Sequence, residues 1–220
     1  MRKSRAWLVI GSLATVAFIF LAISVKLEPA WLQNIDTTTQ YLIAPKVKPT
    51  TTKIISLIAL LGSPVLAICW TIIIALLIWL KEHRLTHATW LIFTQLSGCS
   101  AVVIIKEIIR RSRPTKEVIP DSGFSFPSGH TFATAIVVLA ILCLIVPWLQ
   151  DQEIQFTTVL LANGWLILIA FTRLYLRAHF FSDICGSFLF ALSWWEFSRL
   201  LYFKFIQSKQ SAAVSDTVSP

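Results

Sequence analysis

The sequence predicts an all-α integral membrane protein, built as a bundle of six membrane-spanning helices. Hydrophobic residues make up 56% of its 220 residues and charged residues only 14%, and the mean hydropathy is +0.73. A soluble domain carries roughly 25% charged residues. The apolar residues also fall in runs of about 20, which is long enough for a helix to cross a bilayer. Tryptophans lie at the ends of several runs, where interfacial aromatic residues are favoured.

Six apolar runs account for most of the chain. They cover residues 7–25, 54–80, 88–105, 131–148, 156–176 and 181–203. In the second run, Gly62-Ser63-Pro64 predicts a kink, because proline removes a helical hydrogen bond. The fifth run is the weakest, since Asn163 interrupts it. Six crossings leave no room for a separate soluble domain.

The regions outside these runs divide the chain further. Residues 1–53 are expected to form an N-terminal anchor helix and an extracytoplasmic linker, with an interfacial helix at about 30–42. The first run exceeds the ~7–15-residue core of a cleavable signal peptide, and no small-residue cleavage site follows it, so a retained anchor is expected. Residues 54–206 are expected to be the catalytic core, and the polar tail 207–220 is expected to be disordered.

Basic residues indicate the orientation and the partners. Arg2, Lys3 and Arg5 precede the first run, which predicts a cytoplasmic N-terminus. Because the opposite side then also carries many basic residues, the positive-inside rule is not cleanly obeyed. The net charge of +8 is better explained by anionic lipid head groups than by nucleic acid. The four cysteines lack metal-ligand spacing and are expected to be reduced thiols.

Three polar clusters stand out against this apolar background. They are Lys106 with Arg113-Pro114, then Pro127-Ser128-Gly129-His130, and then Arg173 with His179 and Asp183. The first ends the third run and the second opens the fourth, while the last joins the fifth to the sixth. Two crossings separate the two connecting loops, so both loops are expected on the same face of the membrane.

Each cluster has chemistry suited to an anion. Lys106 and Arg113 are seven residues apart, so a helix that continued past Ile105 would point both the same way. Alternatively, Lys106 reaches lipid phosphates and does nothing else. Arg110 and Arg111 are expected to face solvent or lipid. Ser128 is a candidate N-cap, and with Gly129 it would expose N–H groups at a helix N-terminus, which is an anion site.

His179 and Asp183 are spaced i, i+4 and so share one face of a helix. The carboxylate can accept the Nδ1–H of His179 and leave Nε2 free as a nucleophile. A surface His–Asp pair is the ordinary alternative. Taken with the three cations, however, the pair predicts a site that holds a phosphate and cleaves its ester or anhydride bond without a metal.

The three clusters together resemble the signature of the type 2 phosphatidic acid phosphatase (PAP2) and haloperoxidase superfamily. That signature is Lys-x6-Arg-Pro, then Pro-Ser-Gly-His, then Ser-Arg-x5-His-x3-Asp, and every spacing matches in this chain. The resemblance covers the chain from about the second run to the sixth. Two positions depart from it: Thr172 replaces the serine, and Arg177 stands where membrane members often have glycine.

The resemblance implies a six-helix bundle of the PAP2 type and a role for each site residue. His179 would be the nucleophile that forms a phosphohistidine, oriented by Asp183. His130 would protonate the leaving oxygen and later activate water. The remaining implied residues would hold the phosphate oxygens: Lys106, Arg113, Ser128, Gly129 and Arg173. No metal or other cofactor is implied, so a chelator is expected to leave activity intact.

The predicted function is therefore that of a multi-pass membrane lipid phosphatase whose active site faces the extracytoplasmic side. Undecaprenyl pyrophosphate is the favoured substrate, because an outward-facing site suits recycling of a cell-wall lipid carrier; phosphatidylglycerophosphate and phosphatidic acid are alternatives. A non-catalytic protein that binds or transports phospholipids would need no paired His179 and Asp183. Haloperoxidase chemistry is disfavoured, since haloperoxidase members are soluble. The oligomeric state stays open.

Overall fold

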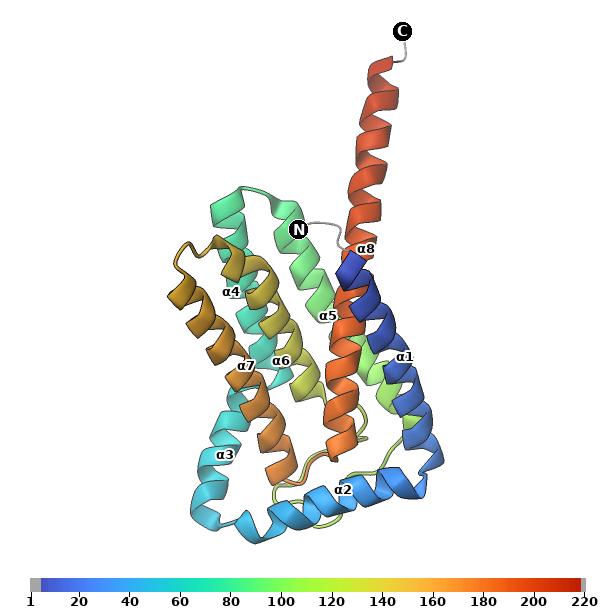
Figure 1. Cartoon of the computed structure of the whole chain (residues 1–220), viewed down its shortest axis with the longest axis vertical. Helices are drawn as coiled ribbons and strands as arrows, with labels where there is room; N and C mark the ends of the chain where they lie inside the picture. The colour runs from blue at the N-terminus through green and yellow to red at the C-terminus, as the bar shows by residue number, and fades with distance from the viewer. Residues whose placement is uncertain (1–4, 219–220) are drawn as a thin grey trace.

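The computed structural model describes residues 5–218, with side chains described through Phe205. All the regular secondary structure in this part of the chain is helical (Figure 1), and a long loop joins α5 to α6. Their bounds are α1 Arg5–Leu27, α2 Ala30–Ile43, α3 Pro49–Leu61, α4 Pro64–Glu82, α5 Leu85–Ile109, α6 Gly129–Ala140, α7 Gln152–Tyr175 and α8 Phe181–Val218. Three short helical segments complete them: η1 Ala44–Lys46, η2 Ile141–Ile145 and η3 Val146–Trp148.

Within the described residues, five segments are long and apolar enough to cross a membrane. They are α1, α4, α5, α7 and the stretch from α6 through η3 that ends at Trp148. The sixth expected crossing is α8, whose apolar residues are interrupted by Asp183, Glu196 and Arg199. α8 packs along α1 and α6 and completes the bundle (Figure 1). The predicted all-α membrane fold is confirmed.

The second crossing differs from the prediction of one kinked span over 54–80. The chain forms two helices, α3 and α4, separated at Gly62 and Ser63. The Ser63 hydroxyl accepts a hydrogen bond from the Leu66 amide at 3.4 Å and caps α4, while Pro64 opens that helix without needing an amide partner. A Cβ on Gly62 would lie 2.4 Å from Cδ1 of Ile169, so glycine lets α7 pack closely against the break.

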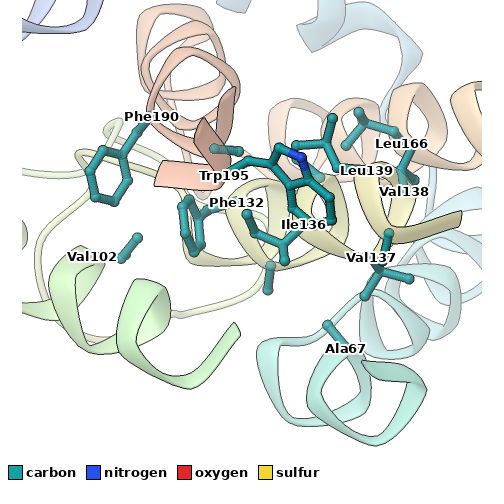
Figure 2. Close-up of a cluster of buried hydrophobic side chains, with 14 of the residues drawn as sticks. Ala67, Val102, Phe132, Ile136, Val137, Val138, Leu139, Leu166, Phe190 and Trp195 are labelled. Carbon is teal, nitrogen blue, oxygen red and sulfur yellow. The ribbon is translucent and has the colours of Figure 1, made fainter. Parts of the chain in front are cut away.

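Helix α6 forms the centre of the bundle. Every residue from Thr131 to Ala140 is buried, and the helix packs against α4, α5, α7 and α8. Figure 2 shows its side chains Phe132 and Ile136 beside Phe190 and Trp195 of α8. Because α6 is buried on all sides, its N-terminus is fixed in the middle of one end of the molecule.

A helix is present at the position predicted for an interfacial helix, 30–42, as α2, and its place at the membrane surface stays a prediction. It lies across the end of the bundle where α5 and α7 finish and where α6 and α8 begin (Figure 1). Its single acidic residue, Asp36, is only 2% exposed, so the side of α2 that carries it faces the bundle. The polar clusters lie at this same end.

Two predictions concern residues at the ends of the chain. Arg2 and Lys3, on which the orientation argument partly rests, lie outside the described residues. The segment 207–220, expected to be disordered, continues as the backbone of α8 through Val218. Its side chains are not described, so the disordered tail stays a prediction, as does the division at residues 53 and 206.

Candidate active site

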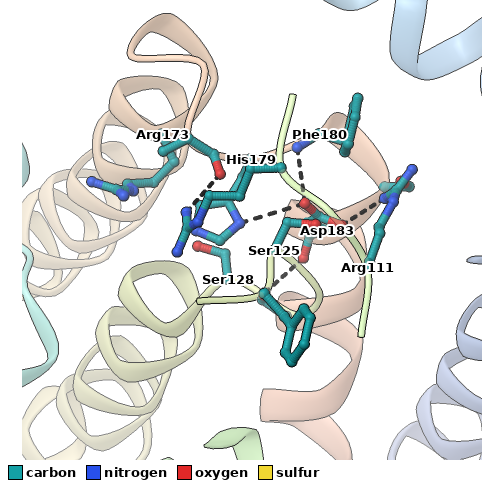
Figure 3. A network of polar contacts seen from close by, with 12 residues as sticks. Arg111, Ser125, Ser128, Arg173, His179, Phe180 and Asp183 are labelled. Carbon is teal, nitrogen blue, oxygen red and sulfur yellow. Dashed lines mark hydrogen bonds and ion pairs between the residues drawn. The ribbon is translucent and has the colours of Figure 1, made fainter. Parts of the chain in front are cut away.

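His179 and Asp183 lie against each other where α7 gives way to α8 (Figure 3). Nδ1 of His179 is 3.4 Å from Oδ2 of Asp183, which is close enough for an electrostatic contact. The two groups do not form a full hydrogen bond. The two side chains are 2% and 0% exposed. Nδ1 therefore faces the carboxylate, and Nε2 is the ring nitrogen left for another partner.

Two further contacts fix the main chain of His179, whose carbonyl accepts from Nε2 of Gln40 at 3.1 Å. Its main-chain amide donates to the carbonyl of Arg173 at 3.3 Å, across the turn between the two helices. Burial lowers the pKa of His179 to about 4, although the carboxylate of Asp183 acts in the opposite direction. The imidazole is therefore neutral near pH 7, which is the form able to act as a nucleophile.

Asp183 makes two hydrogen bonds besides its contact with His179. Oδ2 accepts the amide of Phe180 at 2.9 Å, as the third residue of a helix does in a capping box. Oδ1 accepts from Nη1 of Arg111 at 2.6 Å. Both carboxylate oxygens are thus held, and the side chain cannot rotate away from His179 without losing both hydrogen bonds.

The position of Arg111 contradicts the expectation that it faces solvent or lipid. Its side chain is 9% exposed, and its guanidinium pairs with Asp36 as well as with Asp183. The reason lies in its neighbour: Arg110 ends α5 in the left-handed region, with φ 56°. This residue turns the chain back, so that Arg111 points into the end of the bundle.

Lys106 and Arg113 reach the site by a different route from the one predicted. α5 ends at Ile109, so Arg113 lies in the following loop and not on one helical face with Lys106. Nζ of Lys106 donates to the carbonyl of Phe124, and Nη1 of Arg113 donates to the carbonyl of Ala178 at 2.8 Å. Lys106 therefore contacts the loop that precedes the second cluster, and Arg113 contacts the loop that carries the third.

A carboxylate lies between two of the predicted phosphate ligands. Oδ2 of Asp121 is 3.1 Å from Nη1 of Arg113 and 2.6 Å from Nη2 of Arg173. Burial acts to raise the pKa of Asp121, but the two guanidinium groups outweigh it and the pKa is lowered. An oxyanion bridging two arginines is the arrangement expected of a bound phosphate.

The second cluster begins α6 as the sequence predicts. Ser128 is its N-cap, and its hydroxyl accepts from the amide of Thr131 at 3.4 Å. Gly129 is the first helical residue, and a Cβ there would meet only Pro64 at 3.6 Å. The helix N-terminus therefore points its amides toward the site, which favours an anion there.

His130, in the first turn of α6, lines a cavity of about 250 Å³. Asp121 and Arg173 line the same cavity, and α3 supplies an apolar wall that includes Ala59 and Leu60. The cavity therefore joins an imidazole and a guanidinium to an apolar surface, which suits a ligand that has a charged head and a hydrocarbon tail.

Arg177, which stands where membrane members of the superfamily often have glycine, adopts a backbone conformation that suits glycine. This residue has φ 54°, in the left-handed region that glycine adopts without strain. Its side chain lines a second cavity, of about 470 Å³, together with Arg113 and Lys116. Arg177 thus adds positive charge beside the predicted phosphate ligands.

The predicted clusters lie together at one end of the bundle. Arg173 contacts His179 through its main chain, Arg113 reaches Ala178, and Asp121 joins Arg113 to Arg173. Sequence reasoning missed Asp36, Arg111 and Asp121. Of these three residues, only Arg111 could have been suspected from the sequence, because it lies between Lys106 and Arg113 in the Lys-x6-Arg motif. Among the side chains described, those of residues 5–205, no three His, Cys, Asp or Glu gather as a metal site would need.

Comparisons with known proteins agree with this geometry. The PAP2 superfamily model matches residues 87–207, which is 121 of the 220 residues. Phosphatidylglycerophosphatase B of Bacillus subtilis is 33% identical over 93 residues, which span 40% of this chain and 45% of that protein. The matched stretch is therefore less than half of that relative's length.

A solved structure shares the arrangement of helices over most of this chain. The crystal structure of a transmembrane PAP2-type phosphatidylglycerolphosphate phosphatase from Bacillus subtilis superposes with a TM-score of 0.77. The superposition covers 88% of this chain and 96% of that chain, at 22% sequence identity. At this identity the likeness establishes the arrangement of helices.

Proposed function

Since this chain belongs to the PAP2 superfamily, we propose that it is a membrane lipid phosphatase that uses His179 as its nucleophile. The observation that carries the proposal is the buried pair of His179 and Asp183 beside two arginines that already hold a carboxylate, Asp121. A protein that only binds phospholipids would need the cations, but it would not need an oriented neutral imidazole.

In the first step, Nε2 of His179 attacks phosphorus and the bond to the leaving oxygen breaks. His130 donates a proton to that oxygen, so the lipid alcohol or lipid monophosphate leaves with this oxygen protonated. Lys106, Arg113 and Arg173 stabilise the charge on the other phosphate oxygens, which is the main requirement of phosphoryl transfer. Asp183 stabilises the positive charge that develops on the imidazole.

In the second step, His130, now neutral, takes a proton from a water molecule. The water oxygen attacks phosphorus and the P–N bond breaks, which returns His179 to its starting form and releases inorganic phosphate. Acid–base assistance of this kind is worth about 10²–10⁴ in rate. Arg113 and Arg173 hold the product until it leaves.

Two lipid substrates are supported by different observations. The sequence argument favours undecaprenyl pyrophosphate, through a site on the extracytoplasmic side. The likeness to phosphatidylglycerophosphatase B over 93 residues favours phosphatidylglycerophosphate. Both present a terminal phosphate on a hydrocarbon-bearing group, and the 250 Å³ cavity has charged and apolar walls for such a molecule.

Phosphate release by the protein purified in detergent tests the proposal. The two lipids are supplied separately, with phosphatidic acid as a third substrate and His179→Ala as the control for contaminating activity. Release of phosphate by the wild type but not by the variant supports a phosphatase. Binding of these lipids without any release would instead indicate the non-catalytic phospholipid-binding alternative.

The orientation is a separate proposal: the end that carries α2 and the polar clusters faces the extracytoplasmic side. A single cysteine placed at Thr37 of α2, in a chain whose four native cysteines are replaced by serine, is expected to react with a membrane-impermeant maleimide added to intact cells. Labelling only after the cells are broken would place the site on the cytoplasmic side.

A further inference from the structure

Three charged side chains form a continuous buried chain behind His179. Asp36 comes from α2, Arg111 from the loop after α5, and Asp183 from the first turn of α8. Nη2 of Arg111 is 2.6 Å from Oδ2 of Asp36, and Nη1 is 2.6 Å from Oδ1 of Asp183. The three side chains are between 0% and 9% exposed.

The formal charges of this chain do not cancel. Two carboxylates and one guanidinium leave one negative charge in excess, and it faces Nδ1 of His179. A buried charge is strongly unfavourable unless it is paired. An imidazole that carries a proton or a phosphoryl group is positive, so it would neutralise the excess. The arrangement therefore matches the charge that the reaction creates on His179.

We propose that Asp36 and Arg111 are positioning residues of the active site. Arg111 fixes the carboxylate of Asp183 against His179, and Asp36 fixes Arg111. The inference rests on the proposed role of His179 as the nucleophile. It assigns the interfacial helix α2 a part in the chemistry, through a side chain that does not touch the phosphate.

Asp36 also holds the first turn of α8, which carries Asp183. Phe180 precedes that helix and has no side-chain oxygen with which to cap it. Asp36 supplies the missing acceptor from α2: its Oδ1 accepts the amide of Ser182 at 2.9 Å, and its Oδ2 accepts the hydroxyl of Ser182 at 2.6 Å. The ring of Phe180 in turn lies 4.1 Å from the guanidinium carbon of Arg111.

Charge changes at the two positions should act on His179 in opposite directions. The charged or titratable groups around its imidazole are Asp183 of α8, Arg173 of α7, Lys106 of α5, His130 of α6 and Asp121 of the loop. Arg111→Gln leaves the carboxylates uncompensated and favours protonated His179. Asp36→Asn removes one of the two carboxylates that neutralise Arg111, so more of its positive charge acts on His179 and Asp183 and disfavours protonated His179. The amide oxygen of the asparagine can still accept the amide of Ser182.

The test is the pH dependence of kcat/KM for the wild type and both variants. The acid limb is expected to move up by about one pH unit in Arg111→Gln and down by about one in Asp36→Asn. One substrate is used throughout, so its own ionisation cancels. In both variants kcat is expected to fall about 10- to 100-fold with little change in KM, as for a misplaced catalytic group.

Two matched variants sharpen the comparison. Arg110→Gln removes one positive charge from the adjacent, exposed residue and is expected to leave both limbs unchanged. Arg111→Lys keeps the charge without the two-pronged contact, so it should restore the acid limb but not the full kcat. A purely structural role is shown, and the proposal overturned, if the acid limbs stay in place or move in the same direction.

A readout without turnover separates this inference from the proposed function. The imidazole of His179 is titrated by NMR in protein with labelled histidine, using His179→Ala to assign the signal. Opposite shifts of its midpoint in an enzyme that releases no phosphate would support the positioning chain and reject the phosphatase. An active enzyme in which the midpoint of His179 does not move would support the phosphatase and reject the positioning chain.

Discussion

Nη2 of Arg173 lies 2.6 Å from Oδ2 of Asp121, so a carboxylate of the protein takes the place between cations where a substrate phosphate is expected. The same oxygen reaches Arg113 at 3.1 Å. Asp121 belongs to the loop between α5 and α6 and is 34% exposed at its side chain. Because Asp121 is partly exposed, we expect a stronger anion to displace its carboxylate from the two arginines.

Asp121→Asn is expected to strengthen binding of phosphate, because the amide no longer competes as an anion for the two arginines. The inhibition constant of inorganic phosphate should fall about tenfold, which corresponds to ~1.4 kcal/mol. Glu117→Gln is the matched control, since that carboxylate lies 3.9 Å from Arg113 and does not bridge the pair. If phosphate instead binds more weakly to Asp121→Asn, the carboxylate organises the arginines and does not occupy their site.

The rate is expected to depend on pH as a bell. The pKa of His179 is lowered to about 4 by burial, so His179 is neutral above that pH and is lost as a nucleophile when the pH falls through it. The acid limb of kcat/KM should lie below the ordinary histidine value of about 6.5. To act as an acid, His130 must be protonated in the substrate complex, where the negative charge of the bound phosphate favours its proton, so its titration gives the alkaline limb of kcat. A profile that rises or falls monotonically would rule out this division of roles.

A chelator is expected to leave kcat unchanged, because in the proposed mechanism Lys106, Arg113 and Arg173 would supply the positive charge that a divalent ion supplies in metal-dependent phosphatases. The measurement is phosphate release before and after dialysis against EDTA. A matched sample dialysed without EDTA controls for loss of protein or lipid. Activity that disappears and returns on addition of Mg²⁺ would contradict the proposed chemistry.

Gly186→Ala is expected to reduce both stability and activity. A Cβ at this position of α8 would lie 2.4 Å from Cε2 of Phe126, a fully buried ring just before the Pro127-Ser128 turn. Overpacking of this kind costs about 1–3 kcal/mol, and displacing the ring moves the N-terminus of α6. The melting temperature in detergent and the rate of phosphate release measure the two effects.

Gly164→Ala provides the matched comparison for that substitution. A Cβ there meets nothing within 4 Å, and alanine favours a helix interior by up to about 1 kcal/mol over glycine. Its melting temperature should stay the same or rise. Equal losses in the two variants would mean that contact with Phe126 is not the cause.

Features that depend on local sequence were predicted well. The helix expected at 30–42 is found at Ala30–Ile43, and Ser128 caps α6 as its position before an apolar helix suggested. The i, i+4 spacing placed His179 beside Asp183. In each case the deciding interaction spans four residues or fewer, or follows from the pattern of apolar residues.

Features that depend on the path of a loop were not predicted. Arg111 was assigned to solvent or lipid because nothing in the sequence shows that Arg110 adopts a left-handed conformation and turns the chain inward. Its partners are 72 and 75 residues away. Asp121 was missed for the same reason, since its contact with Arg173 joins residues 52 positions apart.

The break between α3 and α4 has a consequence for the path a lipid takes. α3 presents Leu57 and Leu60 outward, 65% and 59% exposed, while Leu60 also lines the cavity that holds His130. A lipid whose head group enters the cavity from the side, past Leu60, can keep its hydrocarbon in the membrane, and so avoids ~0.8 kcal/mol for each CH₂ drawn into water. We therefore expect the turnover rate of a lipid that enters from the side to be independent of the length of its hydrocarbon tail.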